Sequence, residues 1–284
     1  MSTSSANALA PSISASALAA QLGRQSSPFI YDVRRAPAFD ASERLIAGAL
    51  RLAPESIDST DAALPKAQTV VVYCVHGHEV SQNAAAKLRA QNVAAVFLDG
   101  GIAGWEAAGL PTMIKNPTLR LAATAGQPSR WVTRERPKID RIACPWLIRR
   151  FIDPSAQFLY VPGKDVLSTA ASQEATPYDV PNVLISHRGP EGERCSFDAL
   201  MEECGLNDPC LLELAHIVRG ADTGKLTLTA QSSGLLAISL GLSQLYADDH
   251  AMLEQGMVVY DALYAWIKSA RGEVHNAALF RKLT

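Results

Sequence analysis

The sequence predicts an α/β domain built on a parallel sheet, followed by a helix-rich α+β domain. In the first half, short segments of β-prone residues alternate with segments of helical composition, which is typical of parallel strands covered by helices. The strands expected there are residues 29–33, 70–73 and 94–98, and the helices are residues 14–22 and 82–90. In the second half helical patterns dominate. The strands expected there are residues 157–161 and 182–186, and the helices are residues 197–204, 209–219 and 235–268.

The length of the chain is sufficient for two domains. Its 284 residues suit two domains of ordinary size. We place the first domain at residues 13–114, a linker at 115–133 and the second domain at 134–280. Residues 110–129 hold three prolines, one glycine and few large apolar side chains, which is typical of a linker.

Composition and charge restrict the cellular compartment and the classes of partner that we expect. The net charge of −2 creates no global field for nucleic acid, which is therefore not an expected partner. The first basic residue is Arg24, so the N-terminus does not resemble a secretory signal. The longest apolar run, residues 234–242, is far shorter than the ~20 residues of a membrane helix. Five cysteines without metal-finger spacing fit a reducing compartment, so we expect a soluble cytoplasmic protein with no membrane partner.

Cys74 is the leading candidate for a reactive residue. It follows the predicted strand Val70–Tyr73 and precedes the helix predicted from Gln82, so its loop lies at a helix N-terminus. Loop amides and the helix dipole stabilise a thiolate or an oxyanion at that place. The alternative is a buried structural cysteine at a strand end. The loop expected to bind the anion consists of Val75, His76, Gly77, His78, Glu79, Val80 and Ser81.

Two histidines flank the glycine of this loop. Either imidazole, that of His76 or that of His78, could lower the pKa of the Cys74 thiol or donate a hydrogen bond to an anion. Both could equally be solvated loop residues without a role. The carboxylate of Glu79 works against anion binding.

Four motifs occur in an order that resembles a rhodanese domain. They are DVR at 32–34, GAL at 48–50, the strand-to-cysteine loop at 74, and LDGGIAGWEAAGLP at 98–111. The resemblance implies a sulfurtransferase-like α/β domain in which Cys74 carries a persulfide between a small sulfur donor and a thiol acceptor, with no cofactor required. It also implies that Asp32 and Arg34 support the active-site loop.

The cysteine loop departs from the rhodanese pattern in two ways. Ordinary members read Cys-x-x-Gly-x-Arg-Ser, whereas this chain has one additional residue and no arginine. A longer loop is similar to those of the related phosphatases and arsenate reductases, which hold a tetrahedral oxyanion. Those loops end in an arginine that binds the anion through two hydrogen bonds, and Val80 cannot do so. We therefore favour sulfane-sulfur chemistry over phosphate or arsenate chemistry.

A basic stretch opens the second half. Residues 130–150 hold seven basic residues against two acidic ones, which predicts either an oxyanion or nucleic-acid surface or simply a solvated face. Within it, Pro145 is expected to open a helix. Cys144 would then lie at a helix N-terminus near Arg141, as a second reactive thiol or as a small packing residue.

Residues of the types that bind metals are scattered over the rest of the second half, without a fixed short spacing between them. If the segments that carry them converge, His187, Asp222 and His250 are the expected ligands of a divalent metal. Together with Arg141 and Arg219 they could instead bind an oxyanion. The ordinary alternative is a set of separate helix caps and salt bridges.

The second half resembles the C-terminal domain of ChrB-type chromate resistance proteins. The matching residues are 136–154, 187–189, 195–200, 218–223 and 248–266. Two hypotheses follow. The first is a Cys74 sulfurtransferase linked to chromate, oxyanion or thiol stress. The second is a non-enzymatic sensor of chromate or a metal, in which the rhodanese-like half provides redox input or docking.

Overall fold

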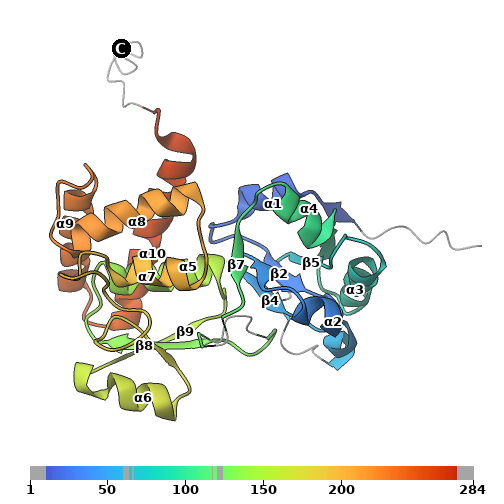
Figure 1. Cartoon of the computed structure of the whole chain (residues 1–284), viewed down its shortest axis with the longest axis horizontal. Helices are drawn as coiled ribbons and strands as arrows, with labels where there is room; N and C mark the ends of the chain where they lie inside the picture. Colours follow the sequence, from blue (N-terminus) through green and yellow to red (C-terminus); the bar gives the residue numbers. More distant parts are fainter. Residues whose placement is uncertain (1–10, 60–63, 66, 117, 120–123, 274–284) are drawn as a thin grey trace, which may run out of the picture.

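The computed structural model describes residues 11–59, 64–65, 67–116, 118–119 and 124–273, which form two halves side by side (Figure 1). The first half is built on a five-stranded parallel sheet with the strand order β1-β6-β5-β2-β4. Its strands are β1 (Ser12–Ile13), β2 (Phe29–Asp32), β4 (Ala49–Arg51), β5 (Val70–Tyr73) and β6 (Ala95–Leu98). The predicted α/β class of this half is confirmed.

Helices cover both faces of this sheet, because the central strand is buried on both sides. Val70 and Val72 of β5 belong to one apolar cluster, and Val71 and Tyr73 belong to another. The helices are α1 (Ala15–Gln21), α2 (Ala36–Asp40), α3 (Glu79–Ala90) and α4 (Gly101–Ala107), with a 3-10 turn at Pro54–Ser59. Side chains of α3 pack in the first cluster, and those of α1 and α4 pack in the second. A separate antiparallel pair joins β3 (Arg44–Ile46) to β7 (Thr112–Ile114).

The second half combines a small sheet with six helices among the residues described, which confirms its predicted α-rich class. The parallel sheet has the order β10-β8-β9. Its strands are β8 (Arg130–Arg134), β9 (Gln157–Val161) and β10 (Thr176–Pro177). The helices are α5 (Asp140–Phe151), α6 (Val166–Ser172), α7 (Ser196–Glu203), α8 (Pro209–Asp222), α9 (Ser232–Leu245) and α10 (Asp249–Ala265). A 3-10 turn at Gly163–Asp165 precedes α6, and a π-helical turn at Trp266–Ala270 follows α10.

Helix α5 lies in the middle of the second core. Its Trp146 is fully buried against the rings of Phe151, Tyr260 and Tyr264, with ring centroids 5.4–6.4 Å away. The indole nitrogen of Trp146 donates a hydrogen bond of 2.8 Å to Asp261. A buried tryptophan requires such a partner, and α10 provides the acceptor and the rings of Tyr260 and Tyr264.

Several predicted elements differ from the observed ones. Residues 182–186 form only an isolated bridge between Tyr178 and Ile185, because Pro181 and the positive φ of Asn182 impose a turn. The helix predicted at 235–268 is two helices, because Asp248 caps a new one by accepting from the Ala251 amide at 2.7 Å.

Three helix or strand starts also differ from the predictions. Helix α5 begins at Asp140, so Pro145 lies inside it rather than at its first position. Helix α3 begins at Glu79 rather than Gln82. Strand β8 was not predicted, and it begins inside the segment predicted as linker.

The two halves share a continuous apolar core. One cluster runs from Leu18 and Trp105 in the first half to Trp146 and Tyr264 in the second. At Gly23, φ is +78° and an added Cβ would lie 2.5 Å from the ring of Tyr264, so only glycine allows this approach.

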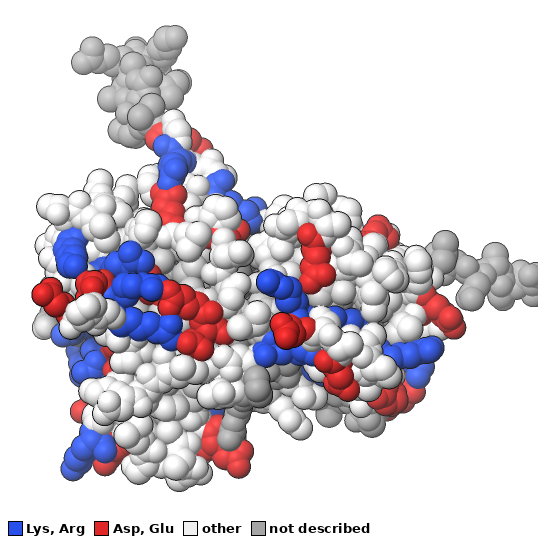
Figure 2. Space-filling model, in the orientation of Figure 1, with Lys and Arg blue, Asp and Glu red and all other residues white. Residues whose placement is uncertain are grey.

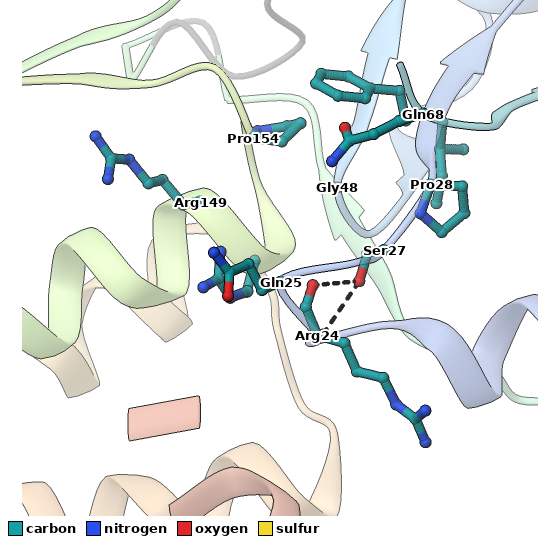
Figure 3. Close-up of a pocket in the computed structure, with 11 residues that line it drawn as sticks. Arg24, Gln25, Ser27, Pro28, Gly48, Gln68, Arg149 and Pro154 are labelled. Atoms are coloured by element: carbon teal, nitrogen blue, oxygen red, sulfur yellow. Dashed lines mark hydrogen bonds between the residues drawn. The ribbon is translucent and has the colours of Figure 1, made fainter. Parts of the chain in front are cut away.

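A small cavity of about 100 Å³ lies at the junction of the halves (Figure 3). Two of the guanidinium groups that line it are already paired, since Arg149 binds Glu254 and Arg150 binds Asp261. These two guanidinium groups are therefore already engaged by carboxylates.

Among the described residues, no helix combines the length and the apolar character that crossing a membrane requires. On the face shown in Figure 2, basic and acidic side chains lie interspersed over the second half. The basic stretch at 130–150 is largely neutralised, because Arg134 and Arg141 bind Asp179 and the two arginines at 149 and 150 are paired as described.

We expect the α5–α10 contact to be sensitive to one added methyl group. A Cβ at Gly256 would lie 2.5 Å from Ile142 Cγ2, an atom close to the α5 backbone that cannot swing away. Gly256→Ala should therefore lower the free energy of unfolding by about 1–3 kcal/mol, measured by urea denaturation. The matched control is Gly241→Ala in α9, where an added Cβ meets nothing within 4 Å and should stabilise the helix by about 0.5–1 kcal/mol. Equal effects of the two substitutions would contradict this packing.

Candidate functional site

Cys74 lies directly after the central strand β5, at the carboxyl edge of the parallel sheet. Ligands of open α/β sheets bind at this edge, where the loops after the strands gather. The side chain is only 6% exposed, and α3 begins five residues later at Glu79. The predicted order of strand, cysteine loop and helix is therefore present in the structure.

Two glycines let the cysteine loop pack against the start of α4. Gly77 has a φ of +74°, and a Cβ there would lie 2.6 Å from the Leu98 carbonyl oxygen. Gly101 has a φ of +57°, and a Cβ there would lie 2.4 Å from the Cys74 carbonyl oxygen. Only glycine fits either position, because any side chain would meet backbone atoms. The amide of Ile102 donates to the Cys74 carbonyl at 3.0 Å, which fixes the loop.

The surroundings of Cys74 favour its thiolate. Burial is the largest single influence and would raise the pKa of the thiol. The hydroxyl of Ser81, 3.2 Å from Sγ, acts in the opposite direction, as do the backbone amides of Ser81, His76 and His78. Together these donors hold the pKa of Cys74 below its usual value. Such a thiolate can act as a nucleophile toward a small electrophile.

The other loop residues have distinct positions. The rings of His76 and His78 are exposed, with centroids 5.9 Å apart, and Glu79 is also exposed. Val80 is half-buried and packs against the apolar cluster beneath α3. Val75 is half-buried, and its carbonyl accepts from the Ala103 amide at 3.0 Å. From Cys74 to Ser81 the loop therefore presents backbone amides and imidazoles but no guanidinium group.

Asp32 and Arg34 form a buried ion pair at the end of β2. The Arg34 Nη2 lies 2.5 Å from the Asp32 Oδ2, and both side chains are at most 2% exposed. The hydroxyl of Tyr73 donates to the same carboxylate at 3.0 Å. The Arg34 guanidinium also donates to the Arg44 carbonyl at 2.9 Å. These contacts tie the ends of β2 and β5 together next to Cys74.

The predicted polar residues of the second half converge only in part. His187 Nε2 lies 3.1 Å from Asp222 Oδ2, as expected for neighbours in one site. His250 is elsewhere, with its exposed ring 5.4 Å from that of Tyr160. Asp140 takes its place, with Oδ2 3.6 Å from the same imidazole nitrogen.

Two aspartates of this cluster were missed by the sequence analysis. Asp140 is the first residue of α5, and Asp179 follows β10 with its Oδ1 3.6 Å from His187 Nε2. Burial raises the pKa of both carboxyl groups. Hydrogen bonds to Asp140 and Asp222 raise the pKa of His187 to about 11. The sequence could not identify either aspartate, because no short spacing links Asp140 or Asp179 to His187. The helix was also expected to start at Pro145, which left Asp140 outside it.

Neither arginine proposed for an oxyanion is free to bind one. Arg141 Nε lies 3.2 Å from Asp179, and Arg219 makes two hydrogen bonds to Asp198, of 2.6 and 2.9 Å. Cys144 is fully buried inside α5, where burial raises the pKa of its thiol well above the usual value. Cys144 therefore has the environment of a packing residue.

Family comparisons match each half to a different domain. Residues 14–108 match the rhodanese-like domain, and residues 131–267 match the ChrB C-terminal domain. Protein ChrB of Cupriavidus metallidurans is 36% identical over 149 residues, which are 52% of this chain and 44% of that protein. The chain thus spans less than half the length of this curated relative.

Two solved structures similar to this chain each cover about a third of it. The rhodanese-like domain of an Anabaena protein is 29% identical and covers 36% of this chain and 77% of that one, with a TM-score of 0.32. A rhodanese-related protein of Thermoplasma volcanium is 24% identical and covers 36% of this chain and 96% of that one, also with a TM-score of 0.32.

The lowered pKa of Cys74 predicts selective alkylation. With limiting iodoacetamide at neutral pH, Cys74 should react before Cys210, which is more exposed but whose pKa is raised by burial and by Asp208. Ser81 stabilises the charged form, so Ser81→Ala should move the midpoint of the rate-against-pH profile of Cys74 to higher pH. Peptide mass mapping over a pH series measures both effects. Faster labelling of Cys210, or an unchanged midpoint in Ser81→Ala, would contradict this account.

Proposed function

We propose that this chain, which joins a rhodanese-like domain to a ChrB C-terminal domain, is a sulfurtransferase that carries sulfur as a persulfide on Cys74. The observation that carries the proposal is the environment of the thiol. The Ser81 hydroxyl and three loop amides surround Sγ and lower its pKa. A thiol with a lowered pKa has a larger thiolate fraction at a given pH, and the thiolate is the nucleophile.

Sulfur transfer takes place in two displacements. The Cys74 thiolate first attacks the outer sulfur of a small donor such as thiosulfate. A new S–S bond forms, the S–S bond of the donor breaks, and sulfite leaves with the electron pair. A thiolate acceptor then attacks the outer sulfur of the persulfide, which breaks the bond to Cys74 and regenerates the thiolate. Both steps are balanced nucleophilic displacements and require no electron carrier.

The loop stabilises the charge that these steps place on sulfur. The outer sulfur of the persulfide is anionic, and amides of residues 75–81 are held ready for it by the glycine contacts. The exposed rings of His76 and His78 are available to contact an anionic donor. A donor of low charge density suits this site because the loop supplies no guanidinium group.

We place this chemistry in the cytoplasm, in resistance to chromate, other oxyanions or thiol stress. The link to chromate is supported by the match of residues 131–267 to the ChrB C-terminal domain. A reducing compartment is supported by the five cysteines, which are all free. A small sulfur donor and a thiol acceptor are the proposed partners, with chromate or another oxyanion as the stress.

A second candidate function is a non-enzymatic sensor of chromate or a metal. The convergence of His187 with three aspartates in the ChrB-like half favours it. In that case the rhodanese-like half provides redox input or docking without turnover. The two functions differ in whether thiosulfate is consumed catalytically.

Replacement of the nucleophile should abolish sulfur transfer. Cys74→Ser should reduce the release of thiocyanate from thiosulfate and cyanide to the uncatalysed background, because a hydroxyl does not form the persulfide. Cys144→Ser and Cys210→Ser remove thiols whose pKa values are raised and should retain the activity. Full activity in Cys74→Ser, or no activity in the wild type, would exclude this mechanism.

Phosphatase activity should be absent. Val80 occupies the place where related phosphatase loops carry an arginine, so nothing in the loop binds a transferring phosphoryl group through two charged hydrogen bonds. Aryl phosphate hydrolysis by the wild type should equal that of Cys74→Ser. A hydrolysis rate that disappears in Cys74→Ser would replace the sulfurtransferase assignment with a phosphatase one.

A further inference from the structure

The structure assigns a divalent metal site to Asp140, His187 and Asp222 in the second half, apart from the proposed sulfur-transfer site. One ligand atom from each of these residues lies within 4.8 Å of the other two. The residues come from three segments: the first residue of α5, the loop before α7, and the last residue of α8. The fold thus brings two carboxylates and one imidazole to a common point.

The distances within the cluster suit ligands around one ion. His187 Nε2 lies 3.1 Å from Asp222 Oδ2 and 3.6 Å from Asp140 Oδ2. Metal–ligand bonds of about 2.0–2.2 Å place adjacent ligand atoms about 3 Å apart. The two separations observed here are near that value, so an ion could be accommodated with small side-chain adjustments.

The imidazole of His187 is oriented for coordination. Its Nδ1 lies 3.1 Å from the Gly192 carbonyl oxygen, which can only accept, so Nδ1 carries the proton in this contact. The other nitrogen, Nε2, faces the carboxylates, and a metal ion would bind its lone pair in place of the proton. A backbone carbonyl that holds the far nitrogen of a histidine is the usual support of a metal ligand.

Asp140 supplies an independent reason for a cation. It is 2% exposed, and its Oδ2 accepts a hydrogen bond of 3.1 Å from the Ser196 amide. Its one ion pair among the described residues is with the imidazole of His187, at 3.6 Å, and no arginine or lysine contacts it there. A buried carboxylate is unfavourable unless cations or donors meet it, and a metal ion would add to the contacts with Ser196 and His187.

The nearby guanidinium groups do not neutralise the carboxylate of Asp140. Arg134 and Arg141 both bind Asp179, and Arg219 binds Asp198. Asp179 in turn accepts from the Ser196 hydroxyl at 3.0 Å, which holds it beside the cluster rather than inside the ligand set. Within the described part of the chain, Asp140 and Asp222 share His187 as their cationic neighbour.

The donor set indicates the class of metal. Two carboxylates with one imidazole suit Mn²⁺, Fe²⁺ or Zn²⁺, and the absence of a thiolate in the set argues against Cu⁺. An oxyanion is disfavoured because the cluster presents carboxylates. The side chain of His187 is 35% exposed, so an ion can enter from solvent and retain water as its remaining ligands.

The test uses Mn²⁺ and the full-length protein after treatment with a chelator. Calorimetry and the loss of the free-Mn²⁺ EPR signal should show one site per chain. Asp222→Asn and His187→Gln, at partly exposed positions, should each weaken Mn²⁺ affinity by about 10–100-fold or more. Circular dichroism melts establish that each variant is folded.

Two control variants distinguish Mn²⁺ binding at this site from an effect of net charge and from sulfur transfer. Glu191→Gln removes one negative charge from an exposed position of the His187 loop and should leave Mn²⁺ affinity unchanged. Cys74→Ser should also bind Mn²⁺ like the wild type, whatever its sulfurtransferase activity. Absence of Mn²⁺ binding by the wild type, or equal affinity in folded Asp222→Asn and His187→Gln, would overturn the proposal.

Discussion

The conformation of the cysteine loop depends on close backbone contacts at two glycines. Gly77 and Gly101 both have positive φ, and each lies where a Cβ would come within 2.6 Å of a carbonyl oxygen. This contact presses the loop against the start of α4 and lets the Ile102 amide bind the Cys74 carbonyl. With the backbone fixed, the loop amides and Ser81 surround Sγ without a conformational search, so the stabilisation of the thiolate does not require a bound ligand. The lowered pKa of Cys74 is thus a consequence of how closely two backbone segments approach.

Much of the first half could be predicted because its signals are local. The run of β-prone residues at β5, the alanine-rich helix after it and the Asp99–Gly101 turn each lie within one short segment, and the observed strands follow them. The identity of Cys74 as the loop cysteine follows from the same segment. The start of α3 was placed three residues late, because Glu79, Val80 and Ser81 join the helix once the loop is folded against α4.

Less of the second half could be predicted because its site depends on tertiary contacts. Asp140 and Asp222 lie at opposite ends of two different helices, and only the packing of α5 with α7 and α8 brings them to His187. His250 carries the right ligand chemistry but lies near Tyr160. Arginines that look available for an anion in the sequence are already bound to aspartates in the fold. Residue type alone could identify the class of ligand but not the members of the set.

The central claim is that Cys74 accepts a sulfur atom. Intact-protein and peptide mass spectrometry after incubation with thiosulfate tests it most directly, because it detects the intermediate rather than turnover. The account predicts a mass increase of one sulfur atom that maps to the Cys74 peptide and is removed by cyanide or a thiol. No added sulfur, or sulfur found instead on Cys210 or another cysteine, would contradict it.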